Sequence, residues 1–387
     1  MIKEFLLPKQ IIVGPGSLNK LGEAVKGMGK KALVVSDSVV GKLGYLDRVK
    51  ATLAEVGIEM AIYDQVNEEP LTTHIADGTK VLKENNCDLV VAIGGGSPID
   101  AAKAIALMGT NPGTIVDYQG SEKAKEPKLP LVAIPTTAGT ASEVTGRSII
   151  TDPETSVKMV IASRNIIPDV AICDAELTMT MPQSVTASTG VDALTHAIES
   201  YISTVGNTLT DDLALSAIRL IGGNLRQAWS NGKNAKAREN MMLGQLIAGM
   251  SFANAAVALV HGMARPVGAY FHVAHGISNA VLLPHVMRFS MIGNPEKFAN
   301  IAVAMGEDIT GLSTLEAAEL GCDAVEALCH DLNIPSFQEM GLDEEKYFQV
   351  AEQMAKDAIA SGSPSFNPRI ATVEEIVELY RVAYYGA

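Results

Sequence analysis

The histidines of this chain are concentrated in one region, and a carboxylate stands at helical spacing from another histidine. Asp192 and His196 lie four positions apart in GVDALTHAIES, which places both side chains on one face if the segment is helical. Neutral imidazoles with a carboxylate suit a divalent transition metal such as iron or zinc. Between positions 261 and 285 the chain places His261, His272, His275 and His285.

These residues alone leave two interpretations open. An Asp-x-x-x-His pair is usually an ion pair on a helix surface or a histidine held in a core. Against that, His261 and His275 are each followed by glycine, which indicates rings held at helix ends with backbone close by. Spacing and composition therefore support a metal centre and a purely structural role about equally.

A glycine-rich turn is the clearest feature of the N-terminal part. The apolar run DLVVAI leads into Gly94, Gly95, Gly96 and Ser97, and we expect a helix from Pro98 with Ser97 as its cap. Glycines allow the backbone to approach a diphosphate, and a helix N-terminus offers free N–H groups to it. The alternative is a tight strand-to-helix turn without a ligand.

Two further segments fit a nucleotide site. The turn PTTAGTASE follows another apolar run and offers small and hydroxyl side chains at Thr136, Thr137 and Thr140. Asp37 follows the apolar run 31–36, where an acid can bond ribose hydroxyls and favour NAD over NADP. The alternative for Asp37 is an ordinary helix cap.

The elements that must position these residues change character along the chain. Apolar runs suited to a parallel sheet alternate with amphipathic segments, which predicts a doubly wound α/β domain over 1–180. We expect its strands at 31–36, 88–93, 131–135 and 169–173, and helices at 46–56 and 73–84. From Pro182 onward, helical spacing predicts an all-α domain over 181–387. We expect its helices at 186–203, 210–230, 237–260, 315–332 and 373–384.

Composition excludes several classes of protein. With 47% hydrophobic and 19% charged residues, the chain can bury a large core. A net charge of −14 without a lysine- or arginine-rich run argues against a nucleic-acid binder. Four cysteines without a CxxC motif indicate free thiols in a reducing cytoplasm, and MIKEFLLPKQ lacks the features of a secretory signal. The uncharged stretch 241–260 contains Gln245, Ser251 and Asn254, so we expect a buried helix and no membrane span.

The motifs together resemble those of a known family. GGGSPID, PTTAGTASEVT, the block 182–199 and HGMARPVGAYFHVAHG are similar to the iron-containing (group III) alcohol dehydrogenases, in order and over essentially the whole chain. The resemblance implies an N-terminal doubly wound nucleotide-binding domain and an all-α metal-binding domain, the architecture shared with dehydroquinate synthase. It also implies a cytoplasmic enzyme that is a homodimer or a higher homo-oligomer.

The resemblance assigns roles by matching positions. It implies NAD as cofactor and a divalent metal, with Fe(II) expected first and Zn(II) as the alternative. The metal ligands it implies are Asp192, His196, His261 and His275. The cofactor-binding positions it implies are Asp37, Asn67, Gly95, Gly96, Ser97, Thr136, Thr137, Thr140 and Lys158.

The substrate side of the site departs from the family at one position. Many members have a histidine four residues after the third metal ligand, where this chain has Arg265. His272 is the residue we expect to replace it in proton transfer, the alternative being a solvent-facing or supporting histidine. The resemblance places Phe252, Leu259 and Ser363 around the substrate.

The expected function is reversible hydride transfer between NAD and a short-chain alcohol or aldehyde, whose oxygen the metal polarises. A different specialisation would use Arg147 and Arg265 to bind an anionic aldehyde, such as a semialdehyde or sulfoacetaldehyde. The plainer interpretation is that Arg265 holds cofactor phosphates and that Arg147 forms a surface or interface ion pair. A dehydroquinate synthase-type reaction and a non-enzymatic nucleotide sensor are two more candidate functions. No nucleic-acid or membrane partner is expected.

Overall fold

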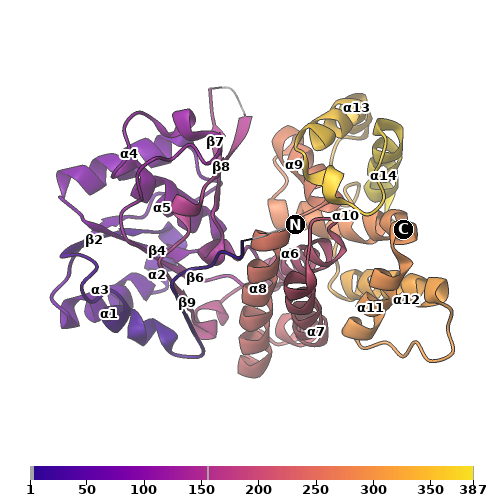
Figure 1. Ribbon diagram of the computed structural model, residues 1–387, viewed down its shortest axis with the longest axis horizontal. Helices are drawn as coiled ribbons and strands as arrows, with labels where there is room; N and C mark the ends of the chain where they lie inside the picture. Colours follow the sequence, from indigo (N-terminus) through magenta and orange to yellow (C-terminus); the bar gives the residue numbers. More distant parts are fainter. Residues whose placement is uncertain (1–3, 155–156, 387) are drawn as a thin grey trace. The chain divides into compact units, whose positions relative to one another are not determined.

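The computed structural model describes residues 4–154 and 157–386. The chain forms two compact units, Met1–Met179 and Thr180–Ala387. The first is an α/β unit and the second is built from helices, as Figure 1 shows. The predicted fold class is confirmed.

A six-stranded parallel sheet forms the centre of the first unit, in the order β1-β9-β6-β4-β2-β3. Its strands are β1 (Gln10–Val13), β2 (Lys31–Val35), β3 (Glu59–Tyr63), β4 (Leu89–Gly94), β6 (Leu131–Pro135) and β9 (Val170–Cys173). A second small sheet joins β5 (Gly120–Ser121), β8 (Val157–Ala162) and β7 (Arg147–Asp152), and the apolar pattern did not predict it.

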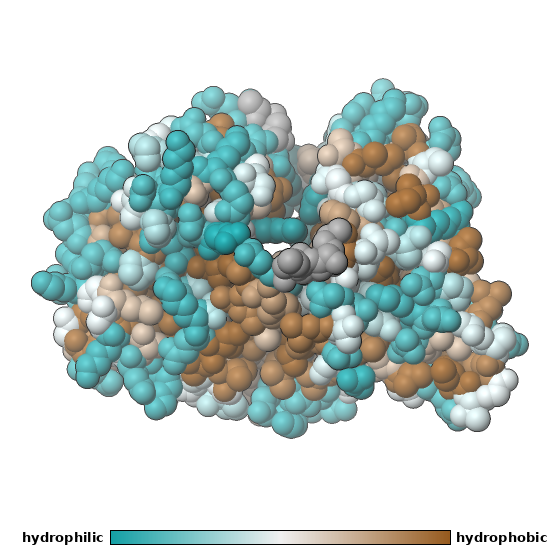
Figure 2. Space-filling model, viewed as in Figure 1, coloured by the Kyte–Doolittle hydropathy of each residue, from teal (hydrophilic) through white to brown (hydrophobic). Residues whose placement is uncertain are grey.

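Both faces of the large sheet are buried. In β2, Leu33 and Val35 face one apolar core, while Ala32 and Val34 face another. Helices α4 (Thr72–Glu84) and α5 (Gly96–Met108) cover the first face, and α1 (Leu21–Ala24) and α3 (Tyr45–Glu55) cover the second. Figure 2 shows hydrophilic residues over much of the outer surface where α3 and α4 lie, as amphipathic covering helices require, whereas α5 has no exposed residue. The apolar strand runs therefore have the physical cause inferred from the sequence.

The second unit consists of helices packed against one another. Its longer helices are α6 (Gln183–Ile202), α7 (Thr208–Ser230), α8 (Ala235–Ala255), α9 (Leu259–Phe271), α10 (His275–Ser290), α11 (Pro295–Met305), α12 (Thr314–Asp331), α13 (Glu344–Ala360) and α14 (Val373–Tyr385). A short 3-10 turn, η7 (Ser363–Phe366), lies between α13 and α14.

One predicted helix is wrong in a way that matters for the site. The segment 237–260 is not continuous, because α8 ends at Ala255 and Ala256 adopts φ 132° and ψ 160°. Helices α8 and α9 are bent by 99° at this break. Within the described residues no single helix is long and apolar enough to cross a bilayer, and the bent pair α8–α9 meets the same length and composition test only when taken together.

Candidate metal centre and nucleotide-binding loops

Helix α6 presents three ionisable side chains from one face. Asp192, His196 and Glu199 follow at intervals of four and three residues, so they project in the same direction. All three are buried, with exposed fractions of 2%, 5% and 1%. Buried groups of this kind are normally paired or bind a cation.

The break between α8 and α9 brings His261 to this face. Glu199 Oε1 accepts a hydrogen bond from the backbone N–H of Val260 at 2.5 Å, at the start of α9. Glu199 Oε2 lies 2.5 Å from His261 Nδ1. When Nδ1 carries the ring proton and donates a hydrogen bond to Glu199, the other ring nitrogen, Nε2, keeps its lone pair for a metal. Glu199 therefore orients the His261 imidazole, which the break between α8 and α9 brings within its reach.

Burial raises the pKa of Glu199 to about 7, although the backbone N–H groups of Ala258, Val260 and His261 act in the opposite direction. A carboxyl buried among apolar side chains loses its hydration, which disfavours its charged form. The same carboxyl accepts the hydrogen bond from His261 Nδ1. Glu199 therefore orients the imidazole, although burial deprives its own carboxyl of hydration.

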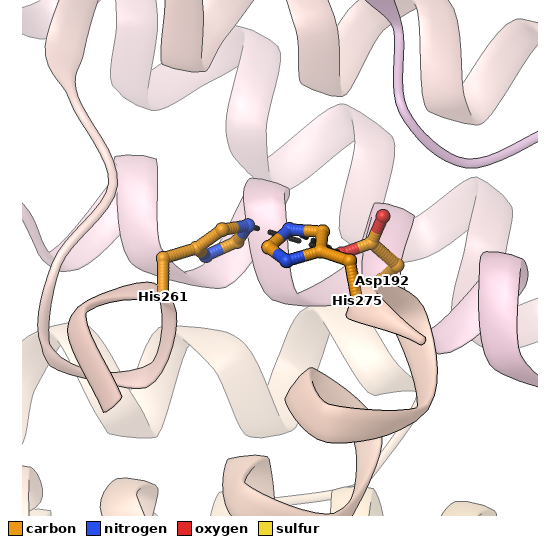
Figure 3. Close-up of side chains that lie close together, drawn as sticks. All are labelled: Asp192, His261 and His275. Atoms are coloured by element: carbon orange, nitrogen blue, oxygen red, sulfur yellow. Dashed lines mark ion pairs between the residues drawn. The ribbon is translucent and has the colours of Figure 1, made fainter. Parts of the chain in front are cut away.

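His275 completes a trio of converging ligand atoms. It is the first residue of α10, and one ligand atom from each of Asp192, His261 and His275 lies within 4.8 Å of the others. Asp192 Oδ1 is 3.8 Å from His261 Nε2 and 3.9 Å from His275 Nε2. Figure 3 shows the three side chains directed toward one another. Burial lowers the pKa of His275, although 39% of its side chain is exposed, and this favours the neutral imidazole that binds metals.

His196 lies beside this trio. Its Nε2 is 3.0 Å from His261 Nε2, and its ring stacks on Phe252 with centroids 4.2 Å apart. Its Nδ1 is buried without a hydrogen-bond partner among the described residues. Two imidazole nitrogens at this distance are stable when a proton or a cation lies between them, because their lone pairs repel.

The donor set fits a divalent transition metal. One carboxylate oxygen and imidazole nitrogens are ligands that iron and zinc both accept, and Glu199 supplies the carboxylate behind a ligating histidine that such centres typically have. The four residues for which the resemblance implied ligation, Asp192, His196, His261 and His275, lie close together.

Arg265 and Ser363 lie together near the metal centre. Arg265 Nη1 donates to Ser363 Oγ at 3.0 Å, and the charge of Arg265 acts on His275. Leu259 is buried as the first residue of α9. His272 is exposed and ends α9 in a left-handed conformation at φ 57°. Its role in proton transfer stays a prediction.

In the first unit, the predicted loops meet at the carboxyl ends of paired strands. Gly94 of β4 is paired with Pro135 of β6, and Thr136 N donates to Gly94 O at 2.9 Å. A Cβ added at Gly96 would lie 2.8 Å from Thr140 Cγ2, so the two turns are in close contact. At Gly95 the nearest atom would be Thr137 Cγ2, at 3.6 Å. The turns after β4 and β6 therefore lie side by side at the carboxyl edge of the large sheet.

The cap of α5 differs from the prediction. Gly95 is the N-cap and α5 begins at Gly96, so Ser97 lies in the first helical turn and does not cap it. The reason is that Gly95 already has the extended conformation of a cap residue, at φ −71° and ψ −165°. The N–H groups of this first turn remain directed out of the helix end.

Asp37 lies beside the glycine turn, and Asn67 bonds the residue that follows Asp37. Asp37 Oδ1 caps α2 (Ser38–Lys42) by accepting from Val39 N and Val40 N at 2.8 and 2.9 Å. Its other oxygen would lie 3.2 Å from a Cβ added at Gly94. Asn67 Oδ1 accepts from Ser38 N at 2.9 Å. Asp37 is thus a helix cap that also borders the candidate nucleotide site.

The two predicted basic residues differ in their surroundings. Lys158 on β8 forms an ion pair with Glu69 at 2.7 Å. The Arg147 side chain has no ion pair with any of the residues that the structure describes, and burial lowers the pKa of its guanidinium. A surface ion pair of Arg147 is therefore not found within the described ranges, and an ion pair at an interface stays a prediction.

Several supporting residues were not identified from the sequence. Glu199 was detectable as the third member of the α6 face, seven residues after Asp192. Lys103, fully buried on α5, holds the second turn by donating to Ser142 Oγ at 2.7 Å and Thr145 Oγ1 at 2.9 Å. Asn279 lies four residues after His275, but its contacts depend on how α6 and α10 pack.

Comparison with known proteins gives concordant matches along the chain. Residues 8–175 match the family model "Iron-containing alcohol dehydrogenase", and residues 186–384 match "Fe-containing alcohol dehydrogenase family, C-terminal". The 1,3-propanediol dehydrogenase of Klebsiella pneumoniae is 45% identical over 98% of both chains. The NAD-dependent methanol dehydrogenase of Bacillus methanolicus is 41% identical over 98% of this chain and 99% of that one. A crystal structure of 1,3-propanediol oxidoreductase superposes with a TM-score of 0.96 at 44% identity, covering 99% of this chain and 100% of that one.

Proposed function

The chain belongs to the iron-containing alcohol dehydrogenase family, and we propose that it interconverts short-chain alcohols and aldehydes with NAD and a divalent metal. The observation that carries this proposal is the convergence of Asp192, His261 and His275 with His196 beside them, supported by Glu199. We propose Fe(II) as the native ion and Zn(II) as the alternative. The family and the two-nitrogen, one-carboxylate trio support a transition metal in general.

The residues present fit both groups that the reaction needs. Asp192, His196, His261 and His275 would hold the cation, which would supply Lewis acidity toward a substrate oxygen. NAD supplies the acceptor or donor of the hydride, with Gly95, Gly96 and the first turn of α5 placed to receive its diphosphate. Asp37 borders this turn with a carboxylate that disfavours a 2′-phosphate.

Other side chains around the metal centre orient its ligands and cover it. Glu199 fixes the His261 ring through Nδ1, and Phe252 covers the His196 ring. Arg265, held by Ser363, keeps a positive charge near His275, where it favours a negatively charged substrate oxygen. The buried free thiols, Cys87, Cys173, Cys322 and Cys329, support our proposal of a cytoplasmic enzyme. A homodimer or higher homo-oligomer is also proposed.

A second candidate concerns the substrate. Arg265 near His275 favours an aldehyde that carries a carboxylate or sulfonate, because a guanidinium binds such groups through paired hydrogen bonds. The deciding experiment is a panel of aldehydes at fixed NADH, comparing propionaldehyde with succinic semialdehyde and sulfoacetaldehyde. A much higher kcat/KM for the neutral aldehyde excludes the anionic specialisation.

The main proposal is tested by chelation and reconstitution. We expect NADH oxidation with aldehydes to stop when the metal is removed and to return when Fe(II) or Zn(II) is added to the chelator-free protein. Undiminished turnover after complete removal of the metal contradicts the proposal. Absence of turnover over a broad alcohol and aldehyde panel, with metal and NAD bound, would favour the nucleotide sensor instead.

A further inference from the structure

Asn279 occupies an unusual position on α10. It is fully buried, and its Nδ2 lies 2.7 Å from Asp192 Oδ1, 3.2 Å from His261 Nε2 and 3.1 Å from His275 Nε2. One amide nitrogen is therefore within hydrogen-bond distance of the ligand atoms of three different residues. These residues come from α6, α9 and α10.

Two helical asparagines elsewhere in this unit behave differently. Asn224 on α7 donates to Leu220 O at 2.8 Å, and Asn254 on α8 donates to Met250 O at 2.9 Å. Each bonds the carbonyl one turn earlier, as asparagine inside helices commonly does. Asn279 does not, and its amide points instead at the ligand cluster.

The placement of Asn279 has a cost in stability. Its Oδ1 is buried without a hydrogen-bond partner among the described residues, and a buried unpaired acceptor is destabilising. Asparagine is also a weak helix former. The amide orientation is nevertheless determined by Asp192, because an amide oxygen 2.7 Å from a carboxylate oxygen would be repelled, whereas an N–H donates to it. A polar group kept under these conditions indicates a role at the site.

We propose that Asn279 is a positioning residue of the metal centre, and this inference rests on the proposed function. Its amide donates to Asp192 Oδ1 and holds that oxygen toward the imidazoles of His261 and His275. Glu199 orients His261 from the opposite side of its ring, through Nδ1. The ligand atoms are thus gathered by two supporting side chains, one on α6 and one on α10.

The test measures metal binding rather than turnover. The full-length protein is stripped with a chelator, and the Kd of Co²⁺ is measured at pH 7 by chelator competition, together with the visible absorption of the bound ion. We expect Asn279→Ala to weaken Co²⁺ binding by about 10–100-fold, as supporting residues of metal centres typically do. The absorption bands should also shift, because Asp192 is no longer held in one orientation.

Asn224→Ala is the matched control, since among the described residues the side chain of this helical asparagine bonds only the Leu220 carbonyl and Asn240. We expect it to lower Tm by about 2–4 °C and to leave the Kd of Co²⁺ unchanged. If Asn279→Ala does not fold, Asn279→Ser carries the same test, because its short hydroxyl cannot reach the three ligand atoms together. The same weakening is expected.

The outcomes separate this inference from the proposed function. Wild-type protein that binds Co²⁺, with Asn279→Ala or Asn279→Ser binding it equally well or more tightly, overturns the positioning role alone. A variant with lowered Tm and unchanged Kd does the same, since that result describes a merely structural asparagine. Wild-type protein that binds no Co²⁺ overturns the metal centre and this inference with it.

Discussion

The two units build their candidate sites from different parts of the chain. The nucleotide edge of the first unit consists of turns that follow adjacent parallel strands, and most of its contacts are backbone or small side chains. The metal centre of the second unit consists of ionisable side chains from separate helices, at positions 192 to 275, all of them buried except the partly exposed His275. Backbone groups form most of the first site, whereas individual side-chain donor atoms form the second.

This difference predicts how each site responds to substitution. Removal of one donor from a centre with few ligands removes a large share of its binding energy, so the effects should be near all-or-none. A backbone edge distributes its contacts over many N–H groups, so single side-chain changes there should have graded effects.

His261→Ala should cause the greatest loss. It removes a ligand whose orientation Glu199 and the α8–α9 break both serve, and we expect turnover to fall by about 10³-fold or more, with loss of bound metal. Metal content by elemental analysis and kcat with NADH measure this. His330→Ala is the control, since that side chain is 90% exposed on α12. A His261→Ala variant that retains metal and turnover contradicts the ligand assignment.

Glu199→Gln should have the next largest effect. Glutamine has nearly the same shape but cannot act as an anionic acceptor for His261 Nδ1, so the imidazole loses its preferred tautomer. We expect metal affinity to fall by about 10–100-fold while the fold is retained. Glu316→Gln, at an exposed capping box on α12, is the matched control and should leave metal affinity unchanged. Equal Kd values for wild type and Glu199→Gln would disprove the orienting role.

The sequence predicts much of this architecture because its signals are local. Runs such as LVAIP are apolar along their whole length, and β6 occupies the predicted residues 131–135. The small sheet of β5, β7 and β8 was missed because its strands are short or only partly buried. The spacing of Asp192 and His196 was visible for the same local reason.

Contacts between helices were beyond the reach of local patterns. The composition of segment 237–260 is that of one continuous helix, yet helix α8 ends at Ala255. After this break, the N–H groups of Val260 and His261 donate to Glu199. Asn279 resembles any polar residue on a helix until α6 is packed beside α10. Such features depend on tertiary packing, which no periodicity encodes.

On the backbone edge, Gly96→Ala should have an intermediate effect. The added Cβ would lie 2.8 Å from Thr140 Cγ2, which forces the two turns apart at a cost of about 1–3 kcal/mol. We expect a lower Tm and a KM for NAD raised several-fold, with metal content unchanged. Gly95→Ala is the internal control for stability, because its Cβ would meet Thr137 at an ordinary 3.6 Å. Loss of metal in Gly96→Ala would show that the two sites are not separable in this way.

Asp37→Asn should have the smallest effect, and it separates the two roles of this residue. Asparagine caps a helix about as well as aspartate, so the bonds to Val39 N and Val40 N are kept and Tm should change little. The substitution removes only the negative charge beside the glycine turn. If that charge disfavours a 2′-phosphate, the ratio of kcat/KM for NADPH to that for NADH rises by about tenfold, which corresponds to about 1.4 kcal/mol. An unchanged ratio together with an unchanged Tm would mean that Asp37 is a helix cap alone, and that cofactor choice is made elsewhere on the edge.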